Sequence, residues 1–145
     1  EEGSGVTFEA QFLKLYEEFG ELCGSIVKGK DVKDDIGDNM VVLINLARLK
    51  GMSLADLIKK HGLGVFLPFN LANVHEYALE LSVTRYPEIF KSGNEISFAR
   101  AYTMIGSLAI EMGTTLEECL QIAYDEIKDR KGKMINGAFI KEGDL

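Results

Sequence analysis

The apolar residues of this chain recur at steps of three and four positions over most of its length, which is the spacing of one face of an α-helix. The clearest stripe predicts a first helix over about residues 7–28 that ends at Gly29. The stripe consists of Phe8, Phe12, Leu15, Phe19, Leu22 and Ile26. The two prolines, Pro68 and Pro87, are expected at element boundaries. Strand signals are absent from the pattern, so we expect an all-α fold.

Further helices follow from the same spacing. They are expected over about residues 32–49, 71–86 and 95–112, with the loop HGLGVFLPFN before the middle one. Ser53, with Asp56 three positions on, caps a short helix. A last helix opens at Thr115, where Glu118 completes a capping box, and runs into the basic segment KDRKGK. The chain is therefore predicted to be a bundle of five main helices and one short helix.

The length and net charge of the chain limit the number of domains and the kinds of partner that we expect. A chain of 145 residues fits one domain that buries roughly 70% of its unfolded surface, with residues 1–6 outside the fold and a basic tail over 128–145. A net charge of −7 opposes binding to a nucleic acid polymer. No apolar run approaches the roughly 18 residues of a membrane span, and the acidic start does not resemble a signal peptide, so we expect a cytoplasmic protein without membrane contact. Cys23 and Cys119 lack metal-ligand spacing and are expected as buried free thiols.

A faint internal echo raises the question of duplication. The segment LARLKGMSLADL, near the end of the second predicted helix, resembles LAIEMGTTLEECL in the second half. If the chain is duplicated, the second copy has lost the acidic residues of the first. Two helices that end in a glycine turn followed by a cap would also look alike for local reasons, so the pattern leaves both explanations open.

Two acidic clusters, EExxE and DDxxD, flank the break at Lys28 and Gly29. On a helix of 100° per residue, Glu18 and Glu21 share one edge of the apolar stripe. On the next helix Asp35 and Asp38 lie on one strip, and the residues after Asp38 are nearly all apolar, which is typical of a buried helix. In an antiparallel hairpin the four carboxylates would lie level with one another.

Four carboxylates brought together repel one another unless a cation lies between them. Oxygen ligands without histidine or cysteine favour Mg²⁺, with Mn²⁺ as an alternative. Gly37, inside the second helix, indicates a close approach of another element. A solvated acidic surface without bound metal would show the same composition, and the residues alone leave that reading open.

The segments EEFGE and DDIGDNMVVLINLA resemble the signature of the MazG-like, all-helical nucleoside triphosphate pyrophosphohydrolases, a family related to the dimeric dUTPases. The likeness covers about residues 8–52, and the ending IKDRKGKMINGAFIKE is similar to the basic tail of some small members. The chain departs from the pattern at Asp35, where the family usually has glutamate. About residues 61–95 show no such likeness.

The resemblance implies a Mg²⁺-dependent enzyme that converts a (deoxy)nucleoside triphosphate and water into the monophosphate and pyrophosphate, by attack of metal-activated water on the α-phosphorus. Such an activity removes surplus or noncanonical nucleotides. The metal ligands carried over are Glu18, Glu21, Asp35 and Asp38. Either Glu21 or Glu17 would accept the proton of the water. The candidate substrate contacts are Lys14, Asn45, Lys128, Arg130, Lys131, Lys133 and Asn136.

Alternatives remain for several of these residues. Lys14 could instead pair with Glu18 at i,i+4, and basic residues at a helix C-terminus favour the helix dipole whatever the function. The acidic hairpin could belong to a noncatalytic helical interaction module, or to an enzyme acting on dUTP or a phosphoribosyl-ATP-like substrate. The apolar second helix needs further cover, so we expect a homodimer or tetramer, unless an internal duplication supplies that cover.

Overall fold

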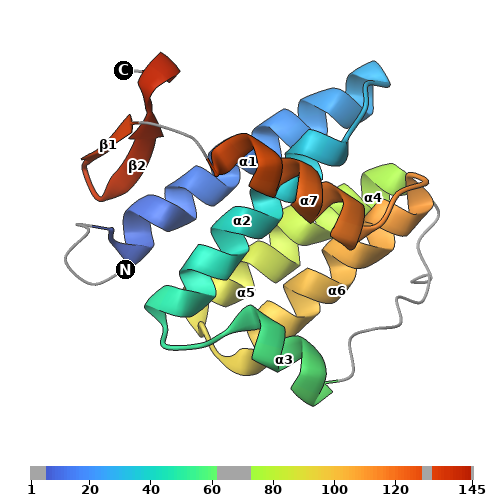
Figure 1. Ribbon diagram of the computed structural model, residues 1–145. Helices are drawn as coiled ribbons and strands as arrows, with labels where there is room; N and C mark the ends of the chain where they lie inside the picture. Colours follow the sequence, from blue (N-terminus) through green and yellow to red (C-terminus); the bar gives the residue numbers. More distant parts are fainter. Residues whose placement is uncertain (1–5, 62–72, 129–131, 145) are drawn as a thin grey trace.

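The computed structural model describes residues 6–61, 73–128 and 132–144, and over these the fold is all-α with one small β-hairpin (Figure 1). Helices α1 (Phe8–Lys28) and α2 (Lys33–Leu49) form an antiparallel hairpin that is followed by α3 (Leu54–His61). A second helical hairpin joins the continuous helix α4–η1–α5 to α6. Its segments are α4 (Val74–Glu80), the π-helical turn η1 (Leu81–Arg85), α5 (Tyr86–Lys91) and α6 (Glu95–Glu111). The last helix is α7 (Leu116–Ile127). The predicted loop at 61–70 lies almost wholly outside the described residues.

Helix α2 lies at the centre of the bundle, because α1 packs on one side of it and α7 crosses another, while α6 also contacts it (Figure 1). Ile36, Met40 and Leu46 on α2 are fully buried. The predicted burial of this helix is therefore confirmed, and the cover comes from within the chain.

Gly37 accounts for the close packing of α2 against α7. A Cβ atom built at this position would lie 2.3 Å from the backbone oxygen of Cys119 and 2.9 Å from Cβ of Ala123. No side chain larger than hydrogen fits at those separations. The close approach predicted for Gly37 is confirmed, and its partner is α7 rather than the other acidic helix.

The helix starts follow their capping residues. Thr7 Oγ1 accepts from the Ala10 amide, Asn94 Oδ1 from the Ser97 amide and Thr115 Oγ1 from the Glu118 amide. The predicted capping box at Thr115 is only half formed, because the Glu118 carboxylate instead accepts from Thr114 Oγ1 at 2.6 Å and pairs with Lys33 at 3.3 Å. These two contacts lower the pKa of Glu118, and they join the start of α7 to the start of α2.

The position of Pro87 corrects the sequence reading. The helix was expected to end at about residue 86, directly before this proline, but Pro87 lies in the first turn of α5, next to the boundary with η1, and the helix continues from Val74 to Lys91. A proline inside a helix removes one backbone donor and crowds the carbonyl four residues before it. The π-helical turn at η1 lies directly before it, and the wider turn absorbs that conflict.

The expectation of no strands is also wrong at the C-terminal end. Strands β1 (Gly132–Ile135) and β2 (Ala138–Lys141) pair antiparallel, with Met134 opposite Phe139. Asn136 and Gly137 form the turn with φ values of 50° and 85°, as a two-residue hairpin turn of type I′ requires. Within the expected basic tail, residues 132–144 therefore form a hairpin followed by the short 3-10 turn η2 (Glu142–Asp144).

The internal echo corresponds to two equivalent corners. Gly51 and Gly113 have φ values of 76° and 82°, and after each of them the chain enters a helix capped by Ser53 or Thr115. Helices α2 and α6, which precede the corners, each have 17 residues. The backbone bonds also match, since the Met52 amide donates to the Ala47 carbonyl and the Thr114 amide to the Ala109 carbonyl, each at 2.9 Å. The structure thus extends the likeness from sequence to local geometry, which is compatible with a duplication.

Candidate functional site

Carboxylates from α1 and α2 line one pocket, here called the acid pocket, which has a volume of about 490 Å³. Its wall also includes residues of β2 and η2, because the β-hairpin lies beside the N-terminal half of α1 (Figure 1). The lining consists of Lys14, Glu17, Glu18, Glu21, Asp38, Ile140, Lys141 and Asp144. The structure thus brings both predicted proton acceptors and three of the four predicted metal ligands to one place.

Glu18 is half-buried in this pocket, and its environment disfavours the charged carboxylate. Burial is the largest effect, followed by the negative charges of Asp38 and Glu21, and together they raise the pKa of Glu18 to about 7. Lys14 acts in the opposite direction without cancelling the shift. A cation bound beside Glu18 would stabilise its charged form.

Asp35 does not line the acid pocket. Its side chain is half-buried, and its backbone carbonyl accepts from Nδ2 of Asn39 at 2.8 Å. Asp38, one helical turn further on, is the α2 carboxylate that acts on Glu18. The departure from the family pattern at Asp35 therefore coincides with the one predicted ligand that lies apart from the others, and its assignment as a metal ligand stays a prediction.

Two lysines supply positive charge to the acid pocket. Lys14 is fixed there, because its ammonium donates to the backbone carbonyl of Phe139 at 3.2 Å. Lys141, at the end of β2, also lines the pocket and lies 3.9 Å from Asp144. The sequence reading missed Lys141. The signal that could have found it is the Asn-Gly pair in MINGAFIKE, which marks a hairpin turn and hence a strand that folds back.

The other predicted substrate contacts lie elsewhere. Lys128 pairs with Asp125 at 3.8 Å, and Lys133 and Asn136 are exposed on the hairpin. Asn45 lines two other pockets beside Arg48. Arg130 and Lys131 lie outside the described residues. Of the seven predicted contacts, the structure thus places Lys14 in the acid pocket.

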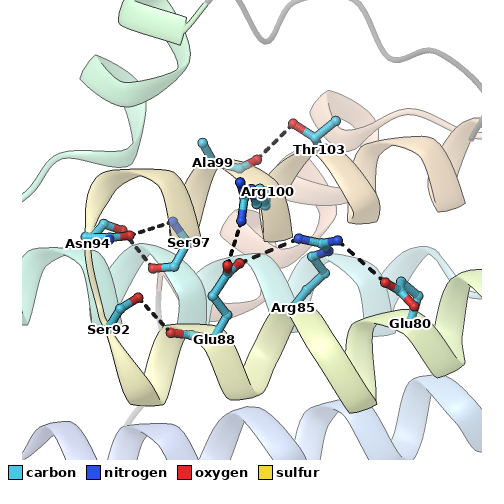
Figure 2. A network of polar contacts seen from close by, with 9 residues as sticks. All are labelled: Glu80, Arg85, Glu88, Ser92, Asn94, Ser97, Ala99, Arg100 and Thr103. Atoms are coloured by element: carbon cyan, nitrogen blue, oxygen red, sulfur yellow. Dashed lines mark hydrogen bonds and ion pairs between the residues drawn. The ribbon is translucent and has the colours of Figure 1, made fainter.

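In the second helical hairpin, two glutamates pair with arginines of the same hairpin. Arg85 lies between Glu80 and Glu88, at 3.5 Å and 3.6 Å, and Arg100 donates to Glu88 at 2.7 Å (Figure 2). Arg100 precedes Gly113 by the same number of residues as Asp38 precedes Gly51. At the position of Asp38 in the first hairpin, the second hairpin therefore has a cationic side chain, and Glu80 and Glu88 have arginine partners within that hairpin.

The donor set of the acid pocket fits a hard divalent cation in its chemistry, since it consists of carboxylate oxygens. As the side chains stand, no three histidine, cysteine, aspartate or glutamate residues within the described ranges are close enough to hold a metal ion. Glu17 and Glu21 are exposed, so a change of rotamer toward an ion costs them little packing. Glu17, Glu18, Glu21 and Asp38 are the residues that could hold Mg²⁺ or Mn²⁺.

A buried polar pair in the core was not predicted from the sequence. Tyr86 is fully buried, and its hydroxyl donates to Oδ1 of Asn39 at 2.9 Å. Tyr77 and Tyr102 are buried as well. Cys119 is buried and Cys23 half-buried, and both are free thiols.

One known protein resembles part of this chain. The chain is 52% identical over 44 residues to an uncharacterized 18.2 kDa protein from the rep-hol intergenic region of Haemophilus phage HP1. That match spans 29% of this chain and 27% of the phage protein. No family model matches the chain, and no solved structure matches it. None of the helices in the described part of the chain combines the length and apolar character that crossing a membrane requires.

Proposed function

We propose that the chain is a Mg²⁺-dependent nucleoside triphosphate pyrophosphohydrolase whose active site is the acid pocket. The observation that supports this most is the convergence of Glu17, Glu18, Glu21 and Asp38 on one pocket, where the pKa of Glu18 is raised to about 7. Such a group of like charges is stabilised by a divalent cation and the anionic ligand that the cation binds. The resemblance of EEFGE and DDIGD to the pyrophosphohydrolase signature supports the same reaction.

The chain's own residues have distinct tasks in the proposed reaction. Glu21 or Glu17, both exposed at the pocket, accepts the proton of the attacking water. The water oxygen forms a bond to the α-phosphorus while the bond to the bridging oxygen of the β-phosphate breaks, which gives the monophosphate and pyrophosphate. Lys14 and Lys141 supply fixed positive charge for the phosphates. When bound, Mg²⁺ supplies charge neutralisation of the triphosphate and of the departing pyrophosphate.

The test is a turnover assay with a panel of ribo- and deoxyribonucleoside triphosphates, dUTP and phosphoribosyl-ATP, with Mg²⁺ present or chelated. We expect release of monophosphate and pyrophosphate that requires Mg²⁺ and falls about 100-fold or more in Glu21→Gln and in Asp38→Asn. Glu9→Gln is the matched control, because Glu9 is an exposed acid on the same helix outside the pocket. No turnover of any nucleotide, or turnover indifferent to both pocket substitutions, would refute the proposal.

A further inference from the structure

A second pocket, here called the amide pocket, lies next to the acid pocket under the same β-hairpin. Gln11, Asn45 and Arg48 form its polar part, Met134 and Phe139 contribute apolar side chains, and its volume is about 270 Å³. Phe139 directly precedes Ile140 of the acid pocket, and Gln11 lies one helical turn before Lys14. The bond from Lys14 to the Phe139 carbonyl thus marks the boundary between the two pockets.

Gln11 is the unusual residue of the amide pocket. Only 3% of it is exposed, yet its side-chain oxygen Oε1 is buried without a hydrogen-bond partner. A buried amide oxygen without a partner is destabilising, and native proteins rarely keep one. Val6 and Leu49, which line the same pocket, show that an apolar side chain would be accommodated here. An amide at position 11 is therefore explained by a ligand that hydrogen-bonds to it.

We propose that the amide pocket binds the base of the nucleotide and that Gln11 hydrogen-bonds to the edge of that base; this rests on the function proposed above. A side-chain amide presents an acceptor and a donor side by side, which matches the paired polar groups on a base edge. Phe139 and Met134 provide apolar surface for the faces of a planar ring. The rise along α1 from Gln11 to Glu18 is about 10 Å, which suits a ligand with its base at one end and its phosphates at the other.

The substitution that tests this is Gln11→Leu, which keeps the approximate size and removes the amide. Since it also removes a buried polar atom without a partner, the variant should fold with an unchanged or higher melting temperature. Gln121→Leu is the matched control, because Gln121 lies on α7 outside both pockets and its amide bonds to Asp125 at 3.0 Å.

The measurement is kcat/KM for nucleoside triphosphates that differ only in the base, together with the inhibition constant of inorganic tripolyphosphate, which has no base. We expect Gln11→Leu to lower kcat/KM for the preferred base by about 10- to 100-fold, mainly through KM, while inhibition by tripolyphosphate stays unchanged. Gln121→Leu should alter neither quantity. Equal turnover of all bases by the unmodified chain, unchanged preference in Gln11→Leu, or a parallel loss of tripolyphosphate binding would overturn the inference.

A separate measurement distinguishes this inference from the proposed function. If no nucleotide is hydrolysed, the pyrophosphohydrolase proposal fails, and calorimetric titration with the free nucleosides then tests the pocket directly. Saturable binding that is lost in Gln11→Leu and kept in Gln121→Leu would support base recognition. No binding of any nucleoside to the unmodified chain would overturn it.

Discussion

Glu18 keeps its proton to a higher pH in the folded chain than in the unfolded one, because its pKa is raised from 4.5 to about 7. Between these two values the folded state binds more protons, so its stabilising effect is complete below pH 4.5 and is lost as the pH rises through about 7. Since the side chain is only half-buried, solvent screening reduces the effect to about 1–2 kcal/mol. Without metal, the free energy of unfolding should therefore fall by about that amount from pH 5 to pH 8.

The measurement is urea unfolding at several pH values in the presence of a chelator, with Glu18→Gln for comparison. The neutral amide has no titration, so this variant should lack that part of the pH dependence and be more stable than the unmodified chain at pH 8. An identical pH dependence in both proteins would show that Glu18 titrates normally.

Gly37 makes a second prediction at the scale of one residue. Gly37→Ala inserts a methyl group 2.3 Å from the Cys119 oxygen, which forces α2 and α7 apart and should cost about 1–3 kcal/mol or more. Gly20→Ala is the control, because Gly20 lies in α1 with no atom within 4 Å of the added carbon. That change should stabilise the chain by up to about 1 kcal/mol. Chemical denaturation measures both, and equal effects would contradict the packing argument.

At the scale of elements, the β-hairpin completes both pockets. Its docking depends on Gly137, whose carbonyl accepts from the Thr7 amide at 2.9 Å. Gly137 has φ 85°, and an added Cβ would lie 2.5 Å from Thr7 Oγ1. Gly137→Ala should therefore detach the hairpin and raise the hydrogen-exchange rate of the Thr7 amide by about tenfold or more.

Gly143→Ala serves as the control for the hairpin, because it follows β2 and meets nothing within 4 Å. In the Gly143→Ala variant, the Thr7 amide should exchange at the same rate as in the unmodified chain. Amide exchange followed by NMR gives both rates, and equally slow exchange in Gly137→Ala would mean that the hairpin is held by other contacts.

The helices were predictable because their stripes and capping residues are local signals, as at Thr7 and Thr115. The hairpin was not predicted because the residues after the basic segment were interpreted as a tail, although their Asn-Gly pair signals a hairpin turn. Pro87 misled because the π-helical turn that accommodates it has no simple sequence signature. Asp35 shows the limit of spacing arguments, since helical periodicity places a residue on a strip but does not say which member of the strip reaches a pocket.

For the whole molecule, the question is whether the apolar surface of α2 is buried within one chain or needs a second copy. The predicted dimer or tetramer rested on an apolar helix that one hairpin could not bury. In the structure α1, α6 and α7 all contact α2, so the buried residues of this helix do not require a second copy. Self-association stays a prediction.

The two helical hairpins differ in how cationic side chains balance their carboxylates. In the second, Arg85 and Arg100 compensate the charge of Glu88. In the first, the lining of the acid pocket has five carboxylates and two lysines, and burial together with the charges of Asp38 and Glu21 raises the pKa of Glu18. We propose that a divalent cation completes this charge balance.

The most direct test of that claim is the melting temperature of the protein as Mg²⁺ is added, followed by calorimetry or fluorescence. We predict a rise of about 4 °C when Mg²⁺ reaches ten times its dissociation constant, absent in Asp38→Asn and in Glu18→Gln. Asp34→Asn, which removes an exposed acid of α2 outside the pocket, should keep the full rise. No rise in the unmodified chain, or the same rise in all four proteins, would contradict the account.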